Sequence, residues 1–175
     1  MAVALHRVAP PLMAARREAV AGTRPLCRSH GVRVSGIFEE RSKSRIETGF
    51  DRDRPSPLFR GSASRTIPAN MPQARRRLFL NHAGDIGADG YETTWPEFRD
   101  ALEAIRKRGF TVASDIVEEP SGIAAPILTA PEIVTADLAR ARVRSETTER
   151  DIEDPAAIAT EAARRISGRL QNLGT

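Results

Sequence analysis

The side chains that most often act as nucleophiles or metal ligands are few in this sequence and widely separated. It has one cysteine, Cys27, and three histidines, His6, His30 and His82. They do not have the short spacings of a zinc site, and no nucleophile or phosphate-loop motif accompanies them. The sequence therefore predicts no catalytic residue, no metal ligand and no cofactor, and we expect a protein that is not an enzyme.

Asp85, Asp89 and Gly90 loosely resemble the calcium loop of an EF-hand. If Gly90 is aligned with the turn glycine of that loop, Gly87 falls at a ligand position and Pro96 replaces the bidentate glutamate. The pattern fails at the residues that would bind the ion. We therefore interpret this segment as a polar loop.

Basic residues slightly outnumber acidic ones, 27 to 23, which gives a formal net charge of +4. The densest basic run is Arg75-Arg76-Arg77. Three consecutive residues of a helix point in different directions, so such a run does not form a single phosphate-binding face. We interpret these arginines as a solvated surface rather than a nucleic-acid interface.

At 175 residues, the chain has the length of one domain with a sizeable core. Aromatic residues make up only 5% of it, which predicts a mainly aliphatic core. No apolar run approaches the roughly 20 residues that span a bilayer, so we expect no membrane partner. A lone cysteine favours a cytoplasmic location, because it cannot form an internal disulfide. We expect an N-terminal extension over 1–10 and a domain over 11–175.

In the N-terminal half, composition and alternation predict a first helix, a hairpin and two further helices. The expected elements are a helix over 11–21, strands over 32–38 and 45–50, a loop over 51–57, helices over 61–70 and 73–82, and a loop over 84–94.

The segment that begins at Trp95 has the strongest helix signals. Thr94 and Glu97 have the spacing of a capping box, and Gly109 can adopt the left-handed conformation that ends a helix. Apolar residues recur on one face of this segment, at Phe98, Leu102 and Ile105.

The remainder of the chain alternates between short apolar segments and one long helix. We expect strands over 110–112, 122–126 and near 133–138, although 136–143 is unusually charged for a central strand. A terminal helix is predicted to begin at Asp154-Pro155, with an apolar stripe formed by Ile158, Ala162, Ile166 and Leu170. The order of these elements predicts an α+β fold with an antiparallel sheet.

Several of these segments, in this order, resemble the effector-binding domain of IclR-type bacterial transcriptional regulators. The segments that carry the resemblance are VRVSGIFE at 32–39, 45–50, PLFRGSAS at 57–64, AIRKRGF at 104–110, GIAAP at 122–126 and EAARRIS at 161–167. The resemblance covers roughly residues 11–173. It implies a GAF-like fold, in which helices flank a curved antiparallel sheet that holds a pocket for a small organic or aromatic effector.

The resemblance also suggests which residues line that pocket. Gly61 and Ser62 match the pair that opens a helix in the family, where backbone N–H groups and the Ser62 hydroxyl would favour a carboxylate. The same two residues would also serve simply to cap the helix. Ala113, Asp115 and Gly122 match the second lining element.

Two departures from the family bear on the pocket. Gly122 stands where several members have cysteine, and Asp137 lies where members have small hydroxyl residues. A carboxylate facing the pocket would disfavour an acidic ligand. The pocket therefore prefers a neutral or cationic molecule, or Asp137 points outward, or the chain is a degenerate, non-sensing relative that keeps only the fold and its association surface.

The family reads DNA through an N-terminal winged helix-turn-helix, and we expect this module to be absent before the first strand. Contact with DNA would then require an attached or partner winged-helix domain. The resemblance implies a homo-oligomer or association with an intact relative.

Overall fold

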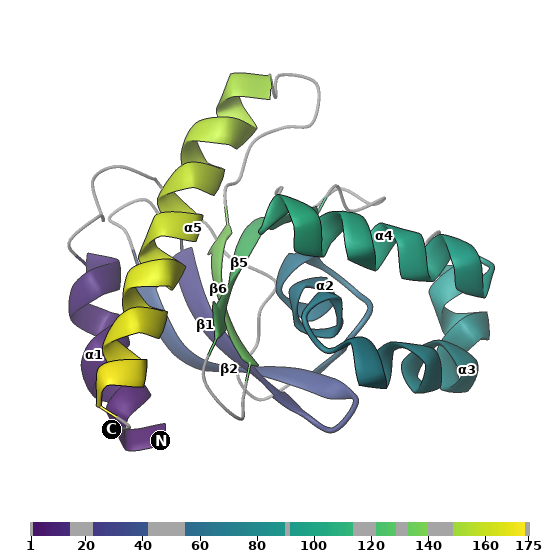
Figure 1. Ribbon diagram of the computed structural model, residues 1–175, viewed down its shortest axis with the longest axis horizontal. Coiled ribbons are helices and arrows are strands. Elements are labelled where there is room, and N and C mark those ends of the chain that lie inside the picture. The colour runs from purple at the N-terminus through teal and green to yellow at the C-terminus, as the bar shows by residue number, and fades with distance from the viewer. Residues whose placement is uncertain are drawn as a thin grey trace.

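The computed structural model describes residues 2–14, 23–41, 55–89, 92–113, 122–128, 133–139 and 149–173. Five helices and six strands occur in these ranges (Figure 1). In chain order they are α1 (Ala2–Ala14), β1 (Thr23–His30), β2 (Arg33–Arg41), β3 (Ser56–Pro57), α2 (Ser62–Ala69), α3 (Pro72–Ala88), α4 (Trp95–Arg108), β4 (Thr111–Ala113), β5 (Gly122–Leu128), β6 (Ile133–Ala139) and α5 (Glu149–Asn172).

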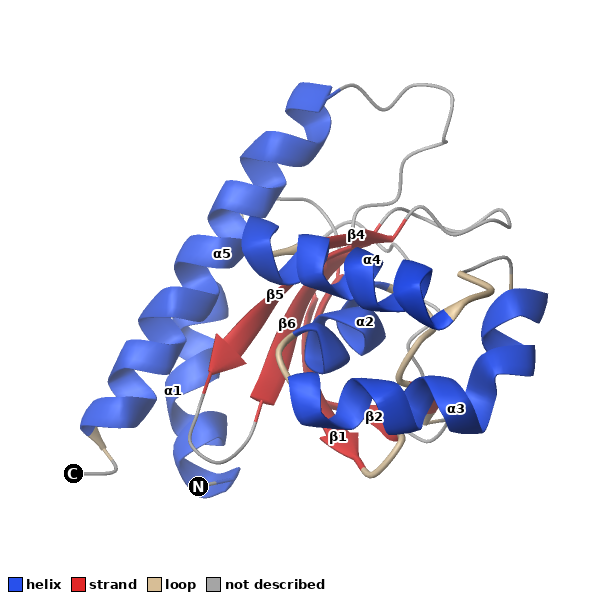
Figure 2. Ribbon diagram, turned by 45° about the vertical axis from the view of Figure 1, so that its right-hand side comes forward, coloured by secondary structure: helices blue, strands red, loops and turns tan. Residues whose placement is uncertain are grey.

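The strands form one sheet in the order β3-β2-β1-β6-β5-β4, and all neighbouring pairs are antiparallel. The pairing of β1 with β6 joins the N-terminal strands to the C-terminal ones, so the sheet depends on residues more than 100 positions apart, such as Leu26 and Ala136. Helices α1 and α5 lie on one face of the sheet, and α2, α3 and α4 lie on the other (Figures 1 and 2). The predicted α+β class with an antiparallel sheet is confirmed.

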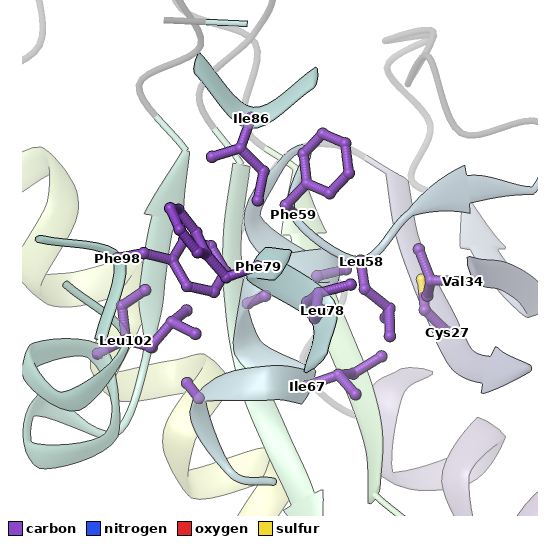
Figure 3. Packing of buried hydrophobic residues seen from close by; sticks show 14 residues of the cluster. Cys27, Val34, Leu58, Phe59, Ile67, Leu78, Phe79, Ile86, Phe98 and Leu102 are labelled. Atoms are coloured by element: carbon purple, nitrogen blue, oxygen red, sulfur yellow. The ribbon is translucent and has the colours of Figure 1, made fainter. Parts of the chain in front are cut away.

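Each face of the sheet has its own hydrophobic cluster. Alternate residues of β5 divide between the two: Ile123 and Ile127 pack under α1 and α5, whereas Ala124 packs under α2. On the α2 face the cluster includes Phe79 and Phe98, whose ring centroids are 5.4 Å apart (Figure 3). The expectation of a mainly aliphatic core holds under α1 and α5, while the α2 face also contains aromatic rings.

Helix α4 begins and ends where its local signals place it. The Thr94 hydroxyl accepts a hydrogen bond from the backbone N–H of Glu97, and the Glu97 carboxylate accepts one from the N–H of Thr94. Gly109 ends the helix with φ 83°, and its N–H donates to the carbonyl of Ile105. This reciprocal cap forms from residues close in sequence, which is why the sequence alone predicts it.

Strand β2 forms a hairpin that the sequence did not predict, whereas its predicted hairpin with 45–50 is not tested. β2 pairs with β1 through a turn at Gly31, which has φ 62°, and β1 was not expected. Strand β1 contains Pro25 and several polar residues, so its sequence lacks the alternation of a half-buried strand. The segment 45–50, the predicted partner of β2, lies outside the described residues.

Two helices begin earlier than predicted. The prediction placed proline at or before the first helical residue, whereas the prolines lie inside both helices. Helix α1 starts at Ala2 and contains Pro10 and Pro11, and α5 starts at Glu149 and contains Pro155. In α1, apolar side chains are buried before the prolines, at Val8 and Ala9, and after them, at Met13, and this burial outweighs the local cost of proline. The division predicted between residues 10 and 11 therefore passes through α1.

The buried stripe of α5 also differs from the predicted one. Ile166 and Leu170 are buried as expected, but Ile158 and Ala162 are only partly buried, and their neighbours Ala159 and Ala163 face the core. Small residues on the buried face let α5 approach the sheet closely, an advantage that a count of large apolar residues does not reveal.

Helix α3 continues six residues beyond its predicted end, to Ala88, with a kink at His82 where φ is −135° and ψ is 17°. Residues 84–88, expected to be a loop, are helical because Ile86 is fully buried. Ser56 and Pro57, also expected in a loop, form the edge strand β3, a position where the missing N–H of proline is tolerated.

No helix in the described part of the chain has both the length and the apolar character needed to cross a membrane.

Replacing the capping residue gives a test of the fold. We expect Thr94→Ala to lower the free energy of unfolding by about 1 kcal/mol, because the N–H of Glu97 loses its acceptor. Chemical denaturation at neutral pH measures this change. Thr160→Ala, at an exposed position within α5, is the matched control and should leave stability nearly unchanged. Equal effects of the two substitutions would contradict the capping role.

Candidate functional site

Helix α2 has an unusual combination of burial and polarity. All eight of its residues are buried, including Ser62, Ser64, Arg65 and Thr66. It lies between the sheet on one side and α3 and α4 on the other (Figure 2). Buried polar groups must be hydrogen-bonded or they cost stability, so the partners of these side chains determine what the helix can do.

The residue before the first turn of α2 has a backbone conformation that only glycine adopts without strain. Gly61 precedes the helix with φ 83° and ψ 170°, and its carbonyl accepts the first helical hydrogen bond, from the N–H of Arg65, at 3.1 Å. The N–H groups of the first turn have no acceptor within the helix and carry the positive end of its dipole. This end of α2 therefore favours a negatively charged or hydrogen-bond-accepting group.

One hydroxyl in the first turn lacks a partner. The Ser64 hydroxyl is buried, with 1% of the residue exposed, and it has no hydrogen-bond partner. A buried hydroxyl without a partner costs about 1–3 kcal/mol, so a native structure that retains one requires an explanation. A bound ligand or water at this position would provide it.

A second pair of hydroxyls joins α2 to the sheet. The hydroxyls of Thr66 and Thr111 lie 2.7 Å apart, and both residues are buried. Thr66 also donates to the carbonyl of Ser62 at 2.9 Å. Because Thr66 has a single hydroxyl proton, Thr111 is the donor within the pair. The arrangement fixes the first turn of α2 against β4.

Two arginines near the start of α2 are paired with carboxylates that follow α3. Arg65 donates to both carboxylate oxygens of Glu92, at 2.6 and 3.0 Å, and its guanidinium lies 5.9 Å from the centroid of the Phe98 ring. Arg60 likewise donates to both oxygens of Asp89, with its Nε 2.9 Å from Oδ2. The positive charge around the start of α2 is thus balanced within the chain.

A third arginine donates hydrogen bonds to backbone carbonyls at the C-terminus of α2. Arg75 is buried and donates through Nε to the carbonyl of Pro68 at 2.9 Å, through Nη2 to the carbonyl of Ala69, and through Nη1 to Glu103 at 2.8 Å. Its charge lies at the negative end of the helix dipole. The hydrogen bond from Arg75 lowers the pKa of Glu103. The prediction that the run 75–77 is solvated is therefore wrong for Arg75 and right for Arg76 and Arg77, which are exposed.

The sheet brings two of the predicted site residues together. Ala113 at the end of β4 pairs directly with Gly122 at the start of β5, and Asp137 of β6 pairs with Ala124, two residues further along β5. Helix α2 packs on β4, β5 and β6. Gly61 and Ser62 lie at the N-terminus of that helix, while Asp115 lies outside the described residues.

The polar residues that the sequence did not single out are Ser64, Arg65, Thr66 and Thr111. Thr66 and Thr111 are 45 positions apart, so their contact leaves no local sequence signal. The unusual density of Ser, Arg and Thr in a short helix is the signal that was available.

The residues considered for metal binding have other contacts. Asp89 binds Arg60, and Asp85 lies within α3 with its Oδ2 3.5 Å from Nδ1 of His82. Cys27 is fully buried in the cluster beneath α2. Within the described ranges, no group of three His, Cys, Asp or Glu side chains is placed to hold a metal ion.

Solved structures share this architecture at low sequence identity. An IclR homologue from Microbacterium hydrocarbonoxydans in complex with 4-hydroxybenzoate is 20% identical, with a TM-score of 0.80 over 98% of this chain and 70% of that one. The C-terminal domain of the Escherichia coli regulator KdgR is 16% identical, with a TM-score of 0.76 over 95% and 98%. IclR from Thermotoga maritima is 18% identical, with a TM-score of 0.78 over 95% and 68%.

Comparison with protein-family models and with curated protein sequences gives no match. The solved structures nevertheless show that this chain has the fold of the C-terminal domain of IclR-type transcriptional regulators. The resemblance inferred from the sequence is thereby confirmed at the level of the fold.

Substitution of Arg75 tests whether its hydrogen bonds to the C-terminus of α2 stabilise the fold. We expect Arg75→Ala to lower the free energy of unfolding by about 3 kcal/mol, since the carbonyl of Ala69 loses its charged donor. The adjacent exposed residue provides the control: Arg76→Ala should change stability by less than about 0.5 kcal/mol. Denaturant titration of both variants measures the difference. Similar values for the two would show that the contacts of Arg75 contribute little.

Proposed function

We propose that this chain is the effector-binding domain of an IclR-type transcriptional regulator and that it binds a small organic acid or aromatic molecule at the N-terminus of α2. The shared fold supports this assignment, and the relative from Microbacterium hydrocarbonoxydans was crystallised with 4-hydroxybenzoate. The site would lie where the first turn of α2 meets β4, β5 and β6.

The observation that carries the proposal is the buried, unpartnered hydroxyl of Ser64 in the first turn of α2. It adds a side-chain donor to the backbone N–H groups that the helix N-terminus presents. A ligand with a carboxylate or hydroxyl would accept a hydrogen bond from the Ser64 hydroxyl and remove the cost of the unpaired group.

We assign the remaining lining residues to the adjoining strands. Ala113 and Gly122, paired across β4 and β5, would leave room beside α2 because neither has a long side chain. Asp137, whose backbone pairs with Ala124 of β5, is a proposed acidic residue of the lining, and Asp115, outside the described residues, is proposed from the family resemblance alone. Their charges would oppose an acidic effector, whereas the N-terminus of α2 would favour one.

The proposed role is regulatory and involves no catalysis. An effector that binds one conformation of the domain better than another shifts the population toward it. Such a shift would rearrange a dimer or tetramer and change the spacing of attached or partner winged-helix domains on DNA. The alternative is a degenerate relative that retains the fold and its association surface but no longer senses an effector.

A ligand-binding measurement distinguishes an effector-binding domain from a degenerate relative that binds no effector. We expect 4-hydroxybenzoate or another member of a panel of small aliphatic and aromatic acids, amides and amines to raise the melting temperature in a saturable manner. A ligand present at 100 times its Kd stabilises the folded state by about 2.7 kcal/mol. Calorimetric titration then gives the affinity. If no member of the panel shifts the transition, the degenerate alternative is favoured.

Ser64→Ala tests the site itself, because stability and binding should move in opposite directions. Without ligand, the variant should be more stable by about 1 kcal/mol, since it loses an unpaired buried hydroxyl. Its affinity for an effector should fall about tenfold, the effect of losing roughly 1.4 kcal/mol.

The matched control is Ser167→Ala. The Ser167 hydroxyl donates to the carbonyl of Ala163 and accepts from the N–H of Leu128. This substitution should therefore destabilise the fold by about 1 kcal/mol and leave binding unchanged. A destabilised Ser64→Ala variant with unchanged affinity would count against the site.

A further inference from the structure

We propose that residues 83–89, here called the hinged segment, form a cover over the N-terminus of α2 that opens at His82 while the rest of the domain stays folded. The segment comprises the last residues of α3 and its C-cap. This inference rests on the proposed function of the α2 site, because the opening admits the effector. It goes further because it identifies the element that controls entry.

A ligand reaches the N-terminus of α2 only if part of the fold moves. Ser62, Ala63 and Ser64 form the first turn of this helix, and each is no more than 4% exposed. The sheet lies on one side of α2, and α3 and α4 lie on the other (Figure 2). Binding at this end of α2 therefore requires the displacement of an element that packs near it.

The hinged segment is anchored by fewer buried side chains than the rest of α3. Before the kink, Arg75, Leu78 and Phe79 are buried. Within the described residues 83–89, Ile86 is the only buried residue, and it belongs to the same hydrophobic cluster as Phe59 (Figure 3). A helical piece of fewer than two turns is not stable by itself, so the segment depends on this packing.

The amino acids of the hinged segment also weaken its helix. Gly84 and Gly87 lie within it, and glycine lowers helix stability relative to alanine. A Cβ atom at Gly84 would meet no atom within 4 Å, and one at Gly87 would lie 3.6 Å from Cγ2 of Thr93, an ordinary contact. Because space does not require glycine at either position, the low stability of this helix comes from its sequence and not from its packing.

The contacts of the hinged segment place it beside the start of α2. The Asp89 carboxylate accepts hydrogen bonds from Nε and Nη2 of Arg60. At the hinge, the ring centroids of His82 and Phe59 are 5.7 Å apart. Phe59 and Arg60 directly precede Gly61, the N-cap of α2. Displacement of the segment therefore removes contacts from the residues next to this N-cap.

Amide hydrogen exchange of the ligand-free domain, resolved by residue with NMR, tests the local opening. We expect the N–H groups of the hinged segment and of residues 62–64 to exchange faster than those of residues 75–81, because opening at His82 leaves the first part of α3 folded. Equal exchange in the three regions would refute the hinge.

A pair of isoleucine substitutions separates local opening from global unfolding. Ile86 and Ile166 are both fully buried, so Ile86→Val and Ile166→Val lower global stability by similar amounts. Ile86→Val should speed exchange in the hinged segment and in residues 62–64 about fivefold, because only the closed segment buries this side chain. Ile166→Val should leave both unchanged. Equal acceleration by the two variants would show that the segment opens only when the whole domain unfolds.

A pair of glycine substitutions acts in the opposite direction. Gly84→Ala should slow exchange of the hinged segment about threefold, because alanine favours the helix and its methyl group has free space. Gly168→Ala is the matched control, since a Cβ atom there also meets no atom within 4 Å but lies in α5. It should leave exchange of the segment unchanged. Unaltered exchange in Gly84→Ala would contradict opening through loss of this helix.

Binding kinetics connect the hinged segment to the effector. If 4-hydroxybenzoate enters and leaves through the opened segment, Ile86→Val raises its association and dissociation rate constants about fivefold each and leaves Kd nearly unchanged. Wild-type rates in a variant whose exchange has changed would show that the effector enters elsewhere and would refute the gating role. If exchange responds as expected but no protein binds the probe, the hinge stands and the proposed function fails for this ligand.

Discussion

The fold depends on hydrogen-bond partners for the polar side chains of α2, a helix that has no exposed residue. Helix α2 is surrounded by the sheet, α3 and α4, yet half of its residues are serine, threonine or arginine. Hydrophobic burial alone would exclude such a helix from a core. It is stable there because nearly every polar group has a partner: Thr111 for Thr66, Glu92 for Arg65, and Arg75 for the carbonyls at the C-terminus. The Ser64 hydroxyl is the exception.

This requirement explains why α3 and α4 lie where they do. Arg75 of α3 binds carbonyls at the C-terminus of α2 and pairs with Glu103 of α4, and the segment between α3 and α4 supplies Glu92 to Arg65. Both helices also contribute to the hydrophobic cluster on this face of the sheet. The apolar contacts provide most of the stabilisation, whereas the charged contacts select one arrangement of the three helices. On the opposite face of the sheet, α1 and α5 pack through aliphatic and small residues, and their contacts place no comparable demand on charge. The two faces thus differ physically, because one is held by apolar packing alone and the other by apolar packing and paired charges.

The parts of the fold that the sequence predicted are those set by local interactions. The capping box at Thr94, the left-handed Gly109 and the apolar face of α4 all involve residues within a few positions of one another. Strand β1 was missed because its place in the sheet is fixed by pairing with distant β6. The early start of α1 was missed because burial of apolar side chains on both sides of Pro10 and Pro11 outweighed the local cost of proline.

The same distinction applies to the candidate site. Gly61 and Ser62 were accessible from the sequence, since a glycine before a helix is a local feature and the resemblance to a family pointed to it. Arg65 and Arg75 were not, because an arginine whose partner lies 27 or 28 residues away reads in one dimension as a solvated charge. Periodicity does not reveal long-range pairing of charges, and here such pairs lie near both ends of α2.

The ion pairs around α2 also join elements that are far apart in the sequence. Glu92 lies two residues before Thr94, the N-cap of α4, so its carboxylate bridges α2 to the start of that helix. Arg75 of α3 joins the C-terminus of α2 to Glu103 of α4 in the same way. Because both arginines are buried, loss of either carboxylate would leave a buried charge less well compensated and would weaken the packing of α4 on α2.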